Sequence, residues 1–494
     1  MKHVDVAVIG AGFAGIGMGI RLRRRGIRSF LIFERADSLG GTWRDNTYPG
    51  VACDVPSHLY SYSFRPNAGW SAFYSPGDEI REYLVASAND EGLGEHLRLG
   101  TDVLGLTWDE SAAHWLLETS RGKHTAGAVI LACGRLTEPR IPDVPGIGNF
   151  AGDLFHSSRW DHGLDLRDKS VVVVGSGASA VQIVPRVAAQ ASRLIVLQRS
   201  APYVIPRAGR PYSAAERGLL ARDAEELARL RSQLFWKAEE AFAQRAGNPD
   251  SLAMARSLAL GHLADQVRDP HTRHRLTPSY EIGCKRVLIS SDYYPTFNQD
   301  NVMLEPSALA AVEGNTLVAA NGARHSADVV VLATGFHAAE QPYARIIRGI
   351  DGRLLSEHWA GGMTAHASTV MNGFPNLFVI NGPNAGLGHN SAIYMIETQI
   401  EYILAALRHW ANLDGGVLNV RAQAEGDYIR MIDDMASSTV WMTGGCETWY
   451  RDARNGRLSL LWPGFAHEFR ALNAEFLPED FELLPCARPR IRAR

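Results

Sequence analysis

The sequence has 494 residues, of which 46% are hydrophobic and 21% charged, so its composition excludes a disordered or collagen-like chain. A net charge of −3 gives no overall field for nucleic acid, and no apolar run reaches the roughly 18 residues of a membrane span, so neither partner is expected. The N-terminal residues lack a signal-peptide pattern, which predicts a cytoplasmic location, and the arginines of residues 488–494 predict a solvated tail.

The first predicted element is a buried strand over residues 4–9, which leads through a glycine-rich turn into a helix. The turn has the pattern GxGxxG, whose glycines allow a tight bend and a close approach of pyrophosphate to the helix N-terminus. The next strand, residues 30–33, ends at Glu34, whose carboxylate would accept hydrogen bonds from ribose hydroxyls and repel a 2′-phosphate. This unit therefore favours FAD. Its predicted cofactor-binding positions are Gly10, Gly12, Phe13, Ala14, Gly15 and Glu34.

A second unit of the same kind begins with a strand over residues 170–174. The position equivalent to Glu34 is Arg199, and a guanidinium there matches a 2′-phosphate, so this unit favours NADPH. Two glycine turns that serve only the geometry of the chain are the competing interpretation. The predicted NADPH-binding positions are Gly175, Ser176, Gly177, Ala178, Ser179, Ala180, Gln198, Arg199 and Ser200.

Residues 211–275 are rich in Ala, Leu, Arg and Glu and predict a helical insertion, opened by a capping box at Ser213 and Glu216. After it, a strand at residues 376–380 and an apolar helix suggest that the chain returns to its first domain. The predicted fold is α/β, with two Rossmann-type dinucleotide-binding domains and a helical insertion. The predicted divisions are 1–142 with 339–494 for FAD, 143–206 with 282–338 for NADPH, and 207–281 for the insertion.

Cysteine usage argues against metal and disulfide chemistry. The five cysteines form no CxxC pair and no metal-ligand spacing, and their odd number favours a reducing compartment. We therefore expect no metal site and no disulfide. The lack of a CxxC pair also disfavours a disulfide reductase among the flavoproteins that use NADPH.

Three longer motifs resemble those of type I Baeyer–Villiger monooxygenases. Residues 150–161 match FxGxxxHxxxWD just before the second unit, and residues 40–54 match GGxWxxxxYPGxxxD. Residues 328–336 match a strand that leads into ATGF, and residues 283–294 resemble the stretch that holds the family's active-site arginine. The resemblance runs from residue 4 to about residue 390, and the later chain matches only loosely.

The resemblance implies an FAD-dependent, NADPH-consuming monooxygenase. Such an enzyme inserts one oxygen atom of O₂ next to a ketone carbonyl, through a C4a-peroxyflavin, to give an ester or lactone. A small ketone and O₂ are the implied partners, and the oligomeric state stays open. Two alternatives are a flavin monooxygenase that oxidises amine nitrogen or sulfide sulfur, and a catalytically silent flavoprotein that acts as a redox-responsive binding partner.

The resemblance also implies roles for individual residues. Arg286 would stabilise the anionic oxygen species, and Asp54 would orient its guanidinium. Lys285 would join Arg199 and Ser200 at the 2′-phosphate. His156 and Trp160, on the linker between the domains, would couple the position of the nicotinamide to domain movement. Predicted contacts to FAD also include Thr42, Trp43, Asp54, Tyr60 and Val103.

Each role has a structural alternative. Arg286 could be a surface cation, Asp54 a turn residue, and His156 a linker histidine whose hydrogen bonds are satisfied locally. The aromatic residues of the C-terminal stretch, Trp441, Trp449 and Trp462, could line a substrate cleft, but we favour a role in anchoring a C-terminal loop to the core.

Overall fold

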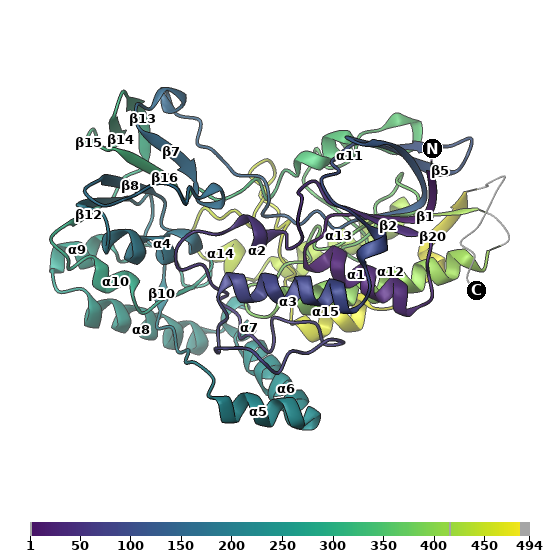
Figure 1. The fold of residues 1–494 in the computed structure, drawn as a ribbon, viewed down its shortest axis with the longest axis horizontal. Helices are drawn as coiled ribbons and strands as arrows, with labels where there is room; N and C mark the ends of the chain where they lie inside the picture. Colours follow the sequence, from purple (N-terminus) through teal and green to yellow (C-terminus); the bar gives the residue numbers. More distant parts are fainter. Residues whose placement is uncertain (1, 414–415, 485–494) are drawn as a thin grey trace.

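The computed structural model describes residues 2–413 and 416–484, so the predicted basic tail and Cys486 lie outside the described residues. Two sheets with flanking helices stand side by side, and helices of the insertion extend below them (Figure 1). This is an α/β fold with two Rossmann-type units and a helical insertion, as predicted. Within the described ranges, none of the helices is long and apolar enough to cross a membrane.

The first sheet contains the first dinucleotide fingerprint. Its central strand β1 pairs in parallel with β2 and β6, and α1 (Phe13–Arg24) connects β1 to β2. Strand β1 is fully buried at Val6 and Val8, which pack in one core with residues of α1 and α12, while Val4 and Ala7 belong to a second core with residues of β4 and β5. The strands, in the order β17-β4-β5-β6-β1-β2-β3 with β18 beside β6, are β1 (Lys2–Ile9), β2 (Phe30–Phe33), β3 (Leu97–Arg98), β4 (Val103–Asp109), β5 (His114–Thr119), β6 (Gly122–Leu131), β17 (Ile347–Arg348) and β18 (Leu377–Val379).

The second sheet is entirely parallel and contains the second fingerprint, with α4 (Ala178–Ala188) following β8. Its order is β12-β9-β8-β16-β7, and a small antiparallel sheet of β13, β14 and β15 lies on the same side of the molecule (Figure 1). The strands are β7 (Asp153–His156), β8 (Ser170–Val174), β9 (Arg193–Leu197), β12 (Val302–Glu305), β13 (Leu309–Glu313), β14 (Thr316–Ala319), β15 (Arg324–Ser326) and β16 (Val329–Leu332).

The predicted helical insertion is confirmed. Ser213 and Glu216 form the expected capping box at the start of its first helix. A two-stranded ladder of β10 (Val204–Ile205) and β11 (Leu288–Ile289) closes the insertion at its base. Its helices are α5 (Ala214–Arg222), α6 (Ala224–Glu240), α7 (Phe242–Arg245), α8 (Pro249–Gln266) and α9 (Pro270–Arg275).

The C-terminal chain returns to the first sheet, because β18 pairs in parallel with β6 and the long helix α12 packs against α1. The residue limits of the domains stay a prediction. The remaining helices and strands are α2 (Thr42–Asp45), α3 (Gly77–Asp90), α10 (Tyr293–Thr296), α11 (Leu355–His358), α12 (Ala392–Ala411), α13 (Ala422–Ala436), α14 (Val440–Thr443), α15 (Ala466–Asn473), β19 (Val417–Val420) and β20 (Phe481–Leu484), and the short 3-10 turns are η1 (Gly94–His96), η2 (Ile147–Asn149), η3 (Ser157–Arg159), η4 (Pro342–Ile346), η5 (Ile350–Gly352) and η6 (Pro478–Asp480).

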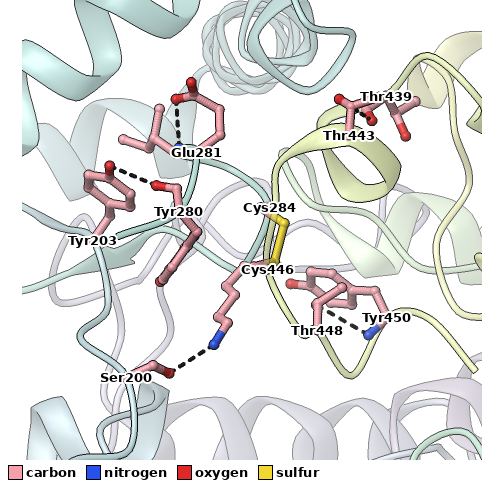
Figure 2. The surroundings of a disulfide bond; sticks show 12 residues. Ser200, Tyr203, Tyr280, Glu281, Cys284, Thr439, Thr443, Cys446, Thr448 and Tyr450 are labelled. Carbon is pink, nitrogen blue, oxygen red and sulfur yellow. Dashed lines mark hydrogen bonds between the residues drawn. A yellow bond between two sulfur atoms is a disulfide. The ribbon is translucent and has the colours of Figure 1, made fainter. Parts of the chain in front are cut away.

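The expectation of no disulfide is wrong, because Cys284 and Cys446 are bonded to each other. They are 162 residues apart in the chain and lie in two loops, one after the insertion and one after α14, that the fold brings together (Figure 2). Sequence spacing could not show this, since the proximity comes from tertiary structure rather than from a local motif.

Candidate active site

A cavity of about 500 Å³, the first cavity, opens at the turn between β1 and α1. Nearly all the positions predicted for FAD contribute to its wall, together with Asn381 and the first turns of α12 at Ala392, Ile393 and Ile396. Of the predicted FAD positions, those that line it are Gly10, Gly12, Phe13, Ala14, Glu34, Thr42, Trp43, Tyr60 and Val103.

The first fingerprint fits a dinucleotide in its local geometry. Gly12 precedes α1 without a side-chain cap, so the N–H groups of the first helical turn are free of a capping oxygen. Gly15 does not line the first cavity. A Cβ atom there would lie 1.8 Å from the carbonyl oxygen of Gly10, so this glycine allows the helix to approach the strand.

Glu34 is buried at the end of β2 and faces the first cavity. Its Oε2 accepts a hydrogen bond from the Ala11 N–H at 2.9 Å, and Arg44 Nη1 lies 3.0 Å from its Oε1. The carboxylate is therefore fixed at the place where an adenosine ribose would lie. Sequence reasoning missed Arg44, although it follows directly on the Gly-Gly-Thr-Trp motif.

The second fingerprint has the same form, but not all its predicted residues face a nucleotide. Gly177 precedes α4 without a side-chain cap, as Gly12 precedes α1. Ala180 is buried in the core of the second sheet, and Gln198 turns away, with its Nε2 donating to the Arg275 carbonyl at 3.0 Å. Ser179 hydrogen-bonds Tyr48 of the first unit, where burial nevertheless raises the pKa of the tyrosine. Gly175, Ser176 and Ala178 complete the β8–α4 turn.

Basic residues meet at the end of β9. Lys285 Nζ donates to Ser200 Oγ at 2.8 Å and lies 4.9 Å from the ring centre of Tyr280. Burial and the charge of Arg199 lower the pKa of Lys285. Arg199 itself is exposed. Three groups suited to a phosphate are thus brought together from two distant segments.

His156 and Trp160 do not share one site. The imidazole of His156 is buried, with its Nε2 hydrogen-bonded to the Gly335 carbonyl at 2.9 Å and its Nδ1 to Ser158, and burial lowers its pKa. Trp160 packs edge-on against Phe155. His156 therefore joins the linker to the turn that contains Gly335, which matches the structural alternative for this residue and leaves its coupling role a proposal.

Asp54 and Arg286 form the ion pair at the centre of the molecule. Arg286 Nε and Nη2 donate to Asp54 Oδ2 at 2.8 and 2.6 Å, and the Asp54 charge holds the pKa of Arg286 above its usual value. The two side chains come from positions 232 residues apart. Neither the surface-cation interpretation of Arg286 nor the turn interpretation of Asp54 describes this pair.

Both members are held by neighbouring elements. The segment before Asp54 is bound to α4, since the Ala52 N–H and carbonyl exchange hydrogen bonds with the Gln182 side chain at 3.2 and 3.1 Å. Arg286 lies between Cys284, which is cross-linked to Cys446, and the β10–β11 ladder. Each side chain is therefore fixed by contacts across different parts of the chain.

A second cavity of about 250 Å³ includes this pair in its wall. Its other residues are mostly apolar and come from the insertion, from β10 and β11 and from the loop before α12. They include Ile205, Ala255, Leu258, Ile282, Val287 and Ile289, together with Gln244 and Arg245. An apolar cavity with a few convergent polar groups is typical of a small-molecule site.

Sequence reasoning missed three residues near Arg286. Tyr450 is buried beside three guanidinium groups, those of Arg286, Arg135 and Arg245, and burial raises its pKa although these charges oppose the shift. No motif marked them, because they come from three separate elements.

Of the C-terminal tryptophans, Trp441 and Trp462 are buried and Trp449 is exposed, which agrees with the anchoring role for the first two.

Comparison with known proteins identifies the family. A family model described as pyridine nucleotide-disulphide oxidoreductase matches residues 7–209. A Baeyer–Villiger monooxygenase of Streptomyces coelicolor is 44% identical over 100% of this chain and 95% of that protein. One of Pseudomonas aeruginosa is 40% identical over 98% of this chain and 92% of that protein. The chain belongs to the Baeyer–Villiger monooxygenase family.

Among solved structures, cyclohexanone monooxygenase from Rhodococcus sp. Phi1 bound to NADP⁺ is 28% identical, with a TM-score of 0.87 over 98% of this chain and 99% of that chain. The monooxygenase uses FAD and NADPH, which agrees with Glu34 at the end of β2 and Arg199 at the end of β9. Family membership favours the oxygen-inserting interpretation over the catalytically silent alternative.

Proposed function

We propose that this monooxygenase converts a small ketone into an ester or lactone, with Arg286 and Asp54 as the central pair. In the balanced reaction, ketone, O₂, NADPH and one proton give ester, NADP⁺ and water. The observation that carries the proposal is the ion pair in the wall of the second cavity, because a fixed guanidinium stabilises negative charge on oxygen beside a carbonyl. FAD, when bound, supplies the redox chemistry by accepting hydride and activating O₂.

The Nε and Nη2 groups of Arg286 each donate one hydrogen bond to Asp54, which leaves both N–H bonds of Nη1 outside this ion pair. We assign Nη1 the role of donating to the ketone oxygen and to the oxyanion that replaces it. Asp54 keeps the guanidinium charged and oriented, and the mostly apolar wall of the cavity lowers the local dielectric constant, which strengthens both interactions.

The same proposal assigns the 2′-phosphate of NADPH to Arg199, Ser200 and Lys285. Support comes from the hydrogen bond between Lys285 and Ser200 and from the lowered pKa of Lys285, which burial and then the nearby charge of Arg199 cause. An anion there would relieve the repulsion between Lys285 and Arg199. His156 and Trp160 are assigned the transmission of domain movement through the Gly335 turn and the second core.

We also propose a cytoplasmic location, with ketone and O₂ as partners and no nucleic acid. Disulfides are rare in the cytoplasm, so the Cys284–Cys446 bond makes this part of the proposal directly testable. Thiol counting on protein from rapidly quenched cells should find these two cysteines reduced if the location is right.

The test of function is product analysis with purified protein, FAD, NADPH and ¹⁸O₂ on a panel of linear, cyclic and aryl ketones and one thioether. We expect a labelled ester or lactone from at least one ketone. Arg286→Ala should abolish ester formation while the bound-flavin spectrum persists, and Asp54→Asn should lower it about 10–100-fold. As a control, Arg324→Ala on the exposed β15 should change nothing. Full oxygenation by Arg286→Ala, or sulfoxide without any ester, would contradict the proposal.

A further inference from the structure

Arg245, at the end of α7, lines the second cavity but has no carboxylate partner among the described residues. Its Nη1 donates to the Ala241 carbonyl at 2.8 Å and to Gln244 Oε1 at 2.7 Å, and its Nη2 donates to the Gly388 carbonyl at 2.9 Å. All three acceptors are neutral. No Asp or Glu in residues 2–413 and 416–484 forms an ion pair with Arg245, whereas Arg286 in the same wall has Asp54.

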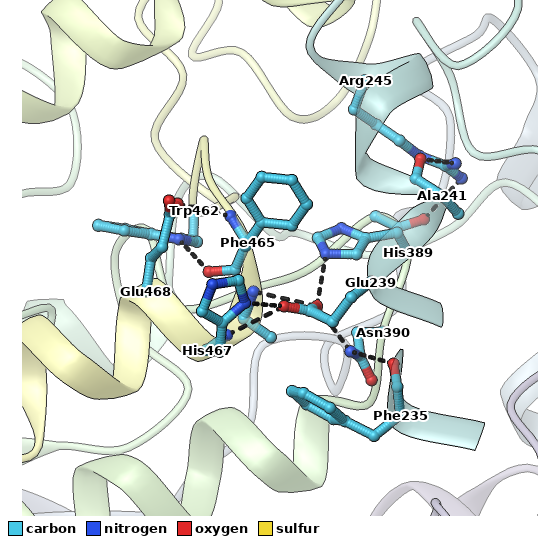
Figure 3. A network of polar contacts seen from close by, with 12 residues as sticks. Phe235, Glu239, Ala241, Arg245, His389, Asn390, Trp462, Phe465, His467 and Glu468 are labelled. Atoms are coloured by element: carbon cyan, nitrogen blue, oxygen red, sulfur yellow. Dashed lines mark hydrogen bonds and ion pairs between the residues drawn. The ribbon is translucent and has the colours of Figure 1, made fainter. Parts of the chain in front are cut away.

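Glu239, a carboxylate of the same insertion, binds other residues with both of its oxygens and does not pair with Arg245 (Figure 3). Its Oε1 accepts from His389 at 3.1 Å, Asn390 at 2.7 Å and the Ala466 N–H at 3.1 Å, and its Oε2 accepts from the N–H and the ring of His467. This network holds the loop that supplies the Gly388 carbonyl to Arg245. It orients the guanidinium without neutralising it.

Arg135, after β6, repeats the pattern. Its Nη1 donates to the Leu460 carbonyl at 2.8 Å, and no ion pair to it exists within the described residues. Burial lowers the pKa of Arg135 and of Arg245 to about 10 each, so both stay charged at neutral pH. Tyr450 between them has a raised pKa and remains neutral. Three guanidinium groups thus lie near Tyr450, and among the described residues Asp54, paired with Arg286, is the one carboxylate that forms an ion pair with any of them.

A partly buried charge without a counter-charge has a desolvation cost, and a ligand of opposite charge would offset that cost. Arg245 and Arg286 share the wall of one cavity of about 250 Å³, and the remaining wall is mostly aliphatic. Such a wall fits a short hydrocarbon chain with an anionic group at one end and a reactive carbonyl at the other.

We propose that the substrate of this enzyme is a short keto acid whose carboxylate is bound by Arg245 while its ketone lies at Arg286. The placement of the ketone at Arg286 rests on the proposed function, whereas the binding of a carboxylate by Arg245 does not depend on it. Arg135 does not line the cavity, but its charge acts on Arg286 and adds to the positive potential beside it. A phosphate of NADPH is the competing candidate for the anion that Arg245 binds, and the experiments below distinguish it from a substrate carboxylate.

The substrate test compares 5-oxohexanoate with 5-oxohexanamide, which differ in charge but hardly in shape. The wild-type enzyme should prefer the acid by about 10–100-fold in kcat/KM, as a charge-assisted hydrogen bond of 1.5–3 kcal/mol provides. Arg245→Gln should bring this ratio close to one, and Arg245→Lys should keep part of it. Arg229→Gln, an exposed arginine of α6 paired with Glu226, is the matched control and should keep the full ratio.

A binding measurement needs no turnover. Hexanoate, which has no ketone, should raise the melting temperature of the FAD-loaded wild-type protein, hexanamide should not, and Arg245→Gln should abolish the effect.

The keto-acid assignment would be overturned, and the proposed function left intact, if the enzyme forms ester from the amide, shows no preference for the acid and has the same melting temperature with and without hexanoate. Binding of hexanoate without ester from any ketone would overturn the function and leave the anion site. A raised KM for NADPH in Arg245→Gln, with an unchanged acid-to-amide ratio, would assign Arg245 to the nucleotide instead and overturn the proposal.

Discussion

At the scale of single residues, the position of a charge relative to its partner decides its role. Arg286 is paired with Asp54, so its charge is held in one orientation, whereas Arg199 at the end of β9 is exposed and its charge acts on Lys285. A paired cation can be fixed before a reaction. An unpaired, exposed cation at the edge of a nucleotide fold is instead suited to an incoming phosphate.

The proposed phosphate site predicts a change in cofactor preference. Arg199→Ala should lower kcat/KM for NADPH about 10–100-fold, the loss of one charge-assisted contact, and leave kcat/KM for NADH nearly unchanged because NADH has no 2′-phosphate. The measurement is steady-state oxidation of both nucleotides with a fixed ketone. Arg193→Ala, an exposed arginine at the start of the same strand, serves as the control. Equal losses with NADPH and NADH would contradict the assignment.

Residues inside a local motif could be predicted from the sequence, and residues outside one could not. Glu34 and Arg199 could be located because a strand, a turn, a helix and a second strand place the end of the second strand next to the first turn. Arg135, Arg245 and Tyr450 come from three elements, and a single sequence carries no information on the distances between them. Gln198 shows the converse, because its place in the motif was right but its side chain turns to Arg275.

At the scale of elements, the segment that contains Lys285 and Arg286 is held from two sides. The Leu288 N–H donates to the Tyr203 carbonyl at 2.9 Å in the β10–β11 ladder, and Cys284 is cross-linked to the loop that leads to Tyr450 (Figure 2). The cross-link therefore joins the two segments that place Arg286 and Tyr450 together. Two short strands alone would leave this segment weakly held.

Replacing both cysteines, Cys284→Ser with Cys446→Ser, should lower stability by about 2–4 kcal/mol, because the unfolded chain regains the freedom that a cross-link removes. The measurement is the urea midpoint with and without dithiothreitol. Dithiothreitol should lower the midpoint of the wild-type protein to that of the double variant and leave the variant unchanged. The prediction fails if thiol counting on purified, air-oxidised wild-type protein finds both cysteines free, or if the two midpoints coincide without reductant.

The elements themselves followed closely from the sequence, for a physical reason. Buried parallel strands are continuous apolar runs, so residues 170–174 and 328–332 could be recognised without knowledge of their neighbours. The capping box at Ser213 and Glu216 is likewise a local hydrogen-bond pattern. The Cys284–Cys446 bond could not be predicted, since it depends on how the insertion and the C-terminal loops pack.

At the scale of the whole molecule, Glu239 joins three distant parts of the chain. It belongs to α6 of the insertion, and it binds His389 and Asn390 before α12 and the start of α15 (Figure 3). Its side chain is 3% exposed. The insertion is therefore attached to the C-terminal chain next to the second cavity by a buried carboxylate with five hydrogen bonds, in addition to the hydrogen bond from Arg245 to the Gly388 carbonyl.

This attachment should depend on pH. Burial raises the pKa of Glu239, but the hydrogen bonds from His389, Asn390 and His467 outweigh burial and bring it to about 2, below the ordinary 4.5. A carboxyl group whose pKa is lower in the folded state stabilises the fold above its unfolded pKa. That stabilisation is lost as pH falls from about 4.5 through about 2, and the shift corresponds to about 3 kcal/mol.

Glu239→Gln should therefore destabilise the protein by a constant amount at pH 6–8, and the difference from wild type should shrink as the pH falls from 4.5 towards 2. It should not vanish, because the amide NH₂ of glutamine would face N–H donors that it cannot satisfy. Urea midpoints across this pH range measure the difference. Glu240→Gln, the next residue of α6, which is exposed and paired with Lys237, should follow wild type at every pH. A wild-type to Glu239→Gln difference that does not change with pH would mean that Glu239 is not ionised in the folded protein, and the buried carboxylate could not then be what attaches the insertion beside the substrate cavity.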